Sequence, residues 1–134
     1  MNVQPENLDR LETLAKIGSS LAGVQFEAAT IEPSRLTDDN WVFGYCFGLL
    51  EAMAQYANLD QYTDGVSMMS NALGKLAGSD PMGMDLFGKA VDLQSDATFS
   101  GGAEAGASDL NAWAANAEAL PTGLARHLAG RAKH

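Results

Sequence analysis

The segment from Asn40 to Leu59, NWVFGYCFGLLEAMAQYANL, is the feature that most constrains how this chain can fold. Its uninterrupted apolar part, residues 41–50, is about 15 Å long as a helix, half of a bilayer's hydrocarbon thickness. A longer span would include Glu51, and an acidic residue near the centre of a membrane helix costs about 2.5 to 3.5 kcal/mol. The segment is therefore expected not to cross a membrane.

Helical periodicity sorts the residues of this segment into one narrow stripe and a broad apolar surface. At 100° per residue, the polar residues and the glycines fall within the stripe, and nearly everything around it is apolar. A helix that is apolar on most sides must be surrounded by other helices, so we predict that residues 39–58 form the central helix of a bundle. The stripe consists of Asn40, Gly44, Gly48, Glu51, Gln55 and Asn58.

Two interpretations of the stripe remain open. In the first, Gly44 and Gly48 allow a neighbouring helix to approach closely, and the polar side chains reach water. In the second, the glycines open a groove in which Glu51, Gln55 and Asn58 face a ligand or a second subunit. A glycine inside a helix costs about 1 kcal/mol relative to alanine, so two of them one turn apart indicate that close approach is needed there.

The rest of the chain shows helical rather than strand patterning. Apolar residues recur at spacings of four and three from Tyr62 to Leu76, and Gly78 is suited to end that helix. Residues 95–107, SDATFSGGAEAGA, are rich in Gly, Ala and Ser, which predicts a flexible linker. Ser108 is suited to cap the next helix, and Pro121 to separate it from a short C-terminal one.

These patterns predict an all-α domain, a small bundle of about five helices. Residues 1–94 are expected to form the core of the bundle and residues 95–107 the linker. Residues 108–134 are expected to form a C-terminal helical segment that packs on the same domain.

Charge and cysteine content limit the expected partners and compartment. The chain has 8 basic and 17 acidic side chains and a net charge of -9, which repels nucleic-acid phosphates and anionic membranes and attracts a basic protein. The first residues do not resemble a secretory signal, and the single cysteine, Cys46, cannot form an internal disulfide. We therefore predict a cytoplasmic protein with neither nucleic acid nor membrane as a partner.

Side chains suited to catalysis or metal binding are few. Two histidines and one cysteine do not make a zinc motif, so no metal and no cofactor is predicted. Cys46 lies within the apolar helix, where burial makes a thiol unreactive. No catalytic residue is predicted, and a non-enzymatic role is favoured without an enzyme being excluded.

The methionines suggest a possible second surface. Met68, Met82 and Met84 cluster around two of the predicted helices. Methionine usually fills the core, but such clusters also form adaptable apolar surfaces for binding.

The function expected from these features is that of a non-catalytic protein-interaction module. Apolar helix faces favour self-association, with a dimer as the preferred state. One alternative is an acidic accessory or inhibitory protein, of the immunity type, that binds a basic partner protein through complementary charge. A second alternative is a small-ligand binder or an enzyme that uses a pocket near Glu51.

Overall fold

The computed structural model describes residues 5–132 and confirms the all-α prediction. Within that range the chain forms six α-helices and two short 3₁₀ helices, and it contains no strand. The elements in order are α1 (Pro5–Ala28), η1 (Pro33–Asp38), α2 (Asn40–Tyr56), α3 (Asp64–Ala77), η2 (Asp80–Met82), α4 (Gly83–Asp92), α5 (Ala97–Ala115) and α6 (Gly123–Ala132).

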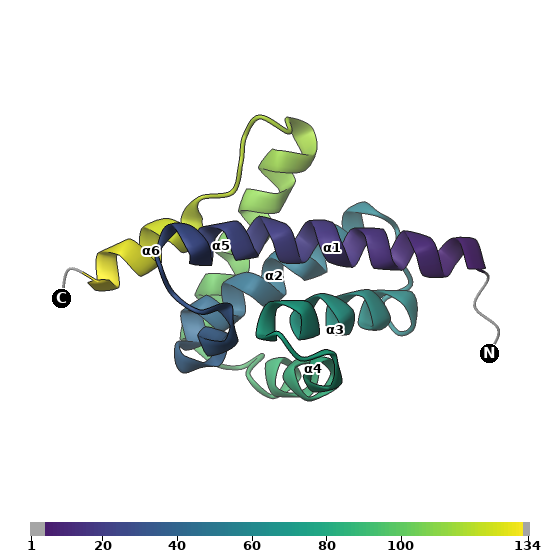
Figure 1. The fold of residues 1–134 in the computed structure, drawn as a ribbon, viewed down its shortest axis with the longest axis horizontal. Coiled ribbons are helices and arrows are strands. Elements are labelled where there is room, and N and C mark those ends of the chain that lie inside the picture. Colours follow the sequence, from purple (N-terminus) through teal and green to yellow (C-terminus); the bar gives the residue numbers. More distant parts are fainter. Residues whose placement is uncertain (1–4, 133–134) are drawn as a thin grey trace.

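The helices are arranged around α2, which contacts each of the other five α-helices. The long helix α1 runs along the molecule, with α3 beside it and α4 beyond α3 (Figure 1). The described chain begins and ends at opposite ends of the molecule, where α1 starts and α6 finishes (Figure 1). No helix in the described range is long and apolar enough to cross a membrane.

The limits of α2 follow from its capping residues. The side chain of Asp39 accepts hydrogen bonds from the backbone N–H groups of Trp41 and Val42, at 2.8 and 3.3 Å, and so caps the first turn. Twelve of the seventeen residues of α2 are buried. The prediction of an apolar central helix is therefore confirmed, with Asp39 as its N-cap.

The predicted flexible linker is wrong, because residues 97–107 form the first half of α5. This helix starts at the cap Asp96, whose carboxylate accepts a hydrogen bond from the N–H of Phe99 at 2.8 Å, and Ser108 lies in its middle. The small residues that suggested flexibility serve instead for close packing: Gly102 and Gly106 are buried against α2. Close packing offsets the intrinsic cost of these glycines in a helix.

One hydrophobic core contains residues from both ends of the chain. Leu11 of α1, Leu110 of α5, and Leu124 and Leu128 of α6 belong to the same cluster of buried side chains. The C-terminal helices therefore take part in the core that α1 to α4 also form.

Candidate functional site

The first half of the α2 stripe is closed by α5. A Cβ atom on Gly44 would lie 2.8 Å from the carbonyl carbon of Phe99, and one on Gly48 would lie 2.5 Å from the Cα of Ala103. Backbone atoms cannot move away as a flexible side chain can, so α5 leaves no space for a side chain at either position. Close approach by a helix of the same chain accounts for these two glycines, and they do not line a groove.

The α5 side of this contact also uses glycines. A Cβ atom on Gly102 would lie 2.9 Å from the backbone nitrogen of Tyr45, and one on Gly106 would lie 2.8 Å from that of Leu49. Both pairs of glycines are spaced four residues apart, so each pair lies on one side of its helix. The contacts advance in step along the two helices, which shows that α2 and α5 run in the same direction.

The second half of the stripe is open. Glu51 and Gln55 are exposed and line a hollow of about 240 Å³, which we call the α2 groove. Its other walls come from the 59–62 loop, α3 and α4, and they include Tyr62, Met69 and Phe87. Glu51 is the only charged side chain among the described residues that line the groove.

Aromatic side chains form much of the groove. Phe47 is 5% exposed, and its ring centroid lies 5.8 Å from that of Phe87, with the two rings inclined at 47°. Tyr62, in contrast, is 79% exposed. Two rings in contact and a third largely exposed to solvent give a surface suited to an apolar or cationic group.

The loop that carries Tyr62 is held by Asp60. The Asp60 carboxylate accepts hydrogen bonds from the N–H groups of Tyr62 and Thr63, at 2.8 and 3.1 Å, and these bonds lower its pKa. The Asp60 carbonyl accepts a further bond from Gly65 at 2.7 Å. Tyr62, expected on the buried face of a helix, therefore precedes α3 in a hydrogen-bonded turn.

Asn58 follows Ala57, the C-cap of α2, and is not among the residues that line the groove. Its φ of 57° is left-handed, a conformation that asparagine tolerates better than most residues. The N–H of Asn58 donates to the carbonyl of Gln55, and that of Leu59 to the carbonyl of Ala54, both at 3.0 Å. This pair of bonds completes the C-terminus of the helix, so Asn58 has a structural role.

The three methionines do not share one environment. Met68 is fully buried in the core, whereas Met82 and Met84 are 44% and 62% exposed. The sulfur of Met84 accepts a hydrogen bond from the hydroxyl of Ser70 at 3.1 Å. None of the three is among the residues that line the α2 groove.

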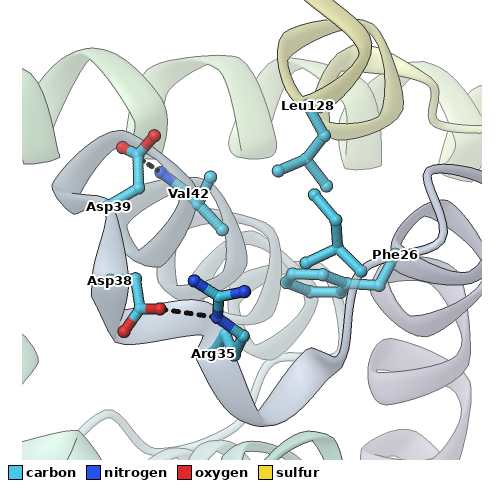
Figure 2. Close-up of a pocket in the computed structure, with 7 residues that line it drawn as sticks. Phe26, Arg35, Asp38, Asp39, Val42 and Leu128 are labelled. Atoms are coloured by element: carbon cyan, nitrogen blue, oxygen red, sulfur yellow. Dashed lines mark hydrogen bonds and ion pairs between the residues drawn. The ribbon is translucent and has the colours of Figure 1, made fainter. Parts of the chain in front are cut away.

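A second hollow, of about 220 Å³, lies beside the opposite end of α2. Figure 2 shows apolar side chains, including Phe26 and Leu128, together with three charged residues. Arg35 forms an ion pair with Asp38 at 2.8 Å, and Asp39 accepts the capping bond from Val42 (Figure 2). The charged groups of this hollow are thus engaged within the chain.

Asp39 also joins α2 to α6. Its carboxylate lies 3.0 Å from Nε2 of His127, whose ring stacks on Trp41 with centroids 4.1 Å apart. Burial acts to raise the pKa of Asp39, but hydrogen bonds from His127, Val42 and Trp41 outweigh it and the pKa is lowered. These contacts join the start of α2 to α6. Sequence patterns did not predict such a role for His127.

A buried polar network reinforces the same junction. The hydroxyl of Tyr45 donates to the carboxylate of Asp109 at 2.7 Å and accepts from the side-chain amide of Gln25 at 3.1 Å. The Asp109 carboxylate also accepts a hydrogen bond from the N–H of Gly123 at 2.9 Å, and the side-chain oxygen of Gln25 accepts one from the N–H of Ala125 at 3.0 Å. The network satisfies two of the free N–H groups at the start of α6 and connects four helices.

Two further observations concern possible chemistry. Burial raises the pKa of the Cys46 thiol to about 12, so at neutral pH this residue is not a nucleophile. Within residues 5–132, no group of three or more His, Cys, Asp and Glu side chains is placed to hold a metal ion. Among the hollows of the described chain, the α2 groove is the one lined by Glu51 and Gln55.

Comparison with protein-family models, curated proteins and solved structures gives no match. The site is accordingly interpreted from its geometry. Of the residues singled out in the sequence, the structure places Glu51 and Gln55 together in the groove. It adds Phe47, Tyr62 and Phe87 to the site. Of these three, only Phe47 could have been predicted from the sequence, because it precedes Glu51 by one helical turn.

Proposed function

We propose that this protein is a non-catalytic binding module whose α2 groove receives a basic segment of a partner protein. The observation that carries the proposal is the composition of the groove. Three aromatic side chains, one methionine and two glutamines line the groove together with one carboxylate, that of Glu51, and no basic residue is among the described residues that line it. Such a surface combines apolar contact with attraction for a positive charge.

The charge of the sequence between Arg35 and Lys75 supports a basic partner. Between Arg35 and Lys75 the sequence contains five acidic residues and no Lys, Arg or His. The whole chain carries a net charge of -9. A field of this sign raises the rate at which a basic protein associates and disfavours acidic competitors.

A second copy of the chain is a less suitable partner. The apolar surface of α2 was the reason to expect self-association, and helices of the same chain, α5 above all, cover most of it. Two copies with a charge of -9 each also repel one another at low ionic strength. Self-association remains a prediction, but the groove favours the alternative of an acidic accessory protein.

An enzymatic role receives less support. General acid–base catalysis commonly uses two titratable groups positioned around the reacting atoms. In the α2 groove the described titratable groups are the Glu51 carboxylate and the phenol of Tyr62, which is largely in solvent. A binding role needs only the aromatic walls and the single charge.

Native mass spectrometry of the tagged chain, isolated from the cells in which it naturally occurs, tests the proposal. We expect a complex with a different chain that is rich in Lys and Arg. Glu51→Lys, which reverses the groove charge, should abolish this complex, and Glu27→Lys, on an exposed part of α1, should retain it. A homodimer in all three samples, with no second chain, would support self-association and overturn the proposal.

A further inference from the structure

The chemistry of the α2 groove narrows the kind of side chain that it accepts. Phe47, Glu51 and Gln55 are spaced four residues apart, so they form one row along α2. The row consists of a nearly buried aromatic ring, an exposed carboxylate and an exposed side-chain amide in that order. A positively charged, planar group with several hydrogen-bond donors complements the carboxylate and the amide together, and its face can pack on the neighbouring rings of Tyr62 and Phe87.

The opposite wall supplies further aromatic surface. Phe87 of α4 contacts Phe47, with ring centroids 5.8 Å apart, and Tyr62 lies at the exposed edge. The face of an aromatic ring carries partial negative charge, which attracts a cation placed over it. Because the described residues that line the groove include no positive side chain, nothing there competes with an incoming cation for Glu51.

The size of the groove indicates an anchor side chain rather than a larger molecule. Its volume of about 240 Å³ is below the range of roughly 300 to 1,000 Å³ typical of sites for drug-sized ligands. A partner segment can run across the outside of the groove while one of its side chains enters.

We infer that the anchor is an arginine side chain of the partner protein, an inference that rests on the function proposed above. The planar guanidinium donates a pair of N–H groups to the Glu51 carboxylate and another to the side-chain oxygen of Gln55. Its flat face packs on the rings of Tyr62 and Phe87, because Phe47 is almost fully buried. Lysine fits less well, because its ammonium is compact, strongly hydrated and has no planar face.

Three capped pentapeptides with the sequence Ala-Leu-X-Leu-Ala, where X is arginine, lysine or citrulline, test the inference. Each is titrated into the full ¹⁵N-labelled chain, and amide chemical shifts are followed by NMR. We expect the arginine peptide to shift amides of residues 47–65 and of Phe87. Citrulline keeps the planar shape without the charge, and its peptide should bind about tenfold more weakly. The lysine peptide should be intermediate.

Matched variants of the chain test whether the arginine peptide binds in the α2 groove. Glu51→Gln should weaken the arginine peptide about tenfold and leave the citrulline peptide unchanged, because only the charged contact is lost. Glu27→Gln removes the same charge elsewhere and should change neither. Tyr62→Ala should weaken the arginine peptide, and Tyr56→Ala should not, because Tyr56 is also an exposed tyrosine but is not among the residues that line the groove.

The possible outcomes separate this inference from the proposed function. Equal binding of the lysine and arginine peptides would overturn the arginine anchor and leave a basic partner in place. Equal binding of the citrulline peptide, or no shift near the groove with any peptide at millimolar concentration, would also overturn it. In those cases the native mass spectra of the Glu51→Lys and Glu27→Lys chains still decide whether the groove binds a basic protein by other contacts.

Discussion

Along one face of α2, Gly44 and Gly48 are covered by the backbone of α5, whereas Glu51 and Gln55, one to two turns further on, are exposed in the α2 groove. The helix is continuous and the face is the same. The two halves of this face differ in the elements that pack against them. α5 contacts the first half through backbone atoms, and the second half faces a wall that includes Tyr62 and Phe87.

The difference teaches how one polar stripe can serve two purposes. Where glycines replace side chains, a second helix comes into backbone contact and the stripe contributes to the core. Where the stripe carries side chains that are too large and too polar to be covered, the neighbouring helix must stay further away and a hollow remains. The first half should therefore respond to mutation through stability, and the second half through binding.

The largest expected effect lies in the closed half. Gly48→Ala places a methyl group where the backbone of Ala103 already lies, so we expect the free energy of unfolding to fall by about 3 kcal/mol, despite the better helix propensity of alanine. Urea denaturation followed by circular dichroism measures this. Gly88→Ala in α4 is the control: nothing lies within 4 Å, and stability should rise by about 0.5 to 1 kcal/mol. Equal tolerance at both positions would contradict the close contact.

Tyr45→Phe should have the next largest effect. The substitution keeps the ring but leaves Asp109 and Gln25 each without one buried hydrogen-bond partner. We expect a loss of about 2 kcal/mol in urea denaturation. Tyr56→Phe, which removes an exposed hydroxyl, should stay within about 0.5 kcal/mol of the native chain. A cost as small as that of the control would show that the network does not join α2 to α5 and α6.

Asp39→Asn tests the junction at the start of α2 and gives a pH dependence. Because folding lowers the pKa of Asp39, its carboxylate stabilises the protein at pH values above the unfolded pKa of about 3.9. That contribution is lost as the pH falls through the folded pKa. The variant should therefore be about 1 kcal/mol less stable at pH 7, and the difference should shrink below about pH 4.

Denaturation across pH 2.5–7 measures this dependence. Asp38→Asn, in an exposed ion pair with Arg35, serves as the control and should change stability by less than about 0.5 kcal/mol. A difference that grows on acidification would have the wrong sign for a lowered pKa.

The smallest effect on stability is expected in the open half. Glu51→Gln and Gln55→Ala alter exposed side chains, so each should leave the free energy of unfolding within about 0.5 kcal/mol of the native value. Thermal and urea denaturation check this. A large change in either direction would mean that the groove residues support the fold, and the contrast between the two halves of α2 would disappear.

Sequence patterns were sufficient to predict the helices that are specified by residues close together in the sequence. The apolar run located α2, and Gly78 ends α3 as expected, with a left-handed φ of 76°. The same reasoning failed for residues 95–107. Glycine and alanine are typical both of flexible segments and of helices in backbone contact, and only the partner helix distinguishes the two.

The candidate site could be predicted only in part. Helical spacing brings Glu51 and Gln55 together, because both lie on one helix. Tyr62 and Phe87 reach the groove from a loop and from α4, and their positions depend on how α3 and α4 pack. No local pattern in a single sequence contains that information.

The contact between α2 and α5 also has a consequence for how the chain is made. Gly44 meets Phe99, and Gly48 meets Ala103, 55 residues later in the sequence. At a synthesis rate of about 5 to 20 residues per second, the apolar surface of α2 remains uncovered for roughly 3 to 11 seconds before the contacting residues of α5 are synthesised. During that interval the nascent chain exposes apolar surface, as an aggregation-prone folding intermediate does. Slowing translation ahead of α5 should therefore increase the binding of the nascent chain by chaperones.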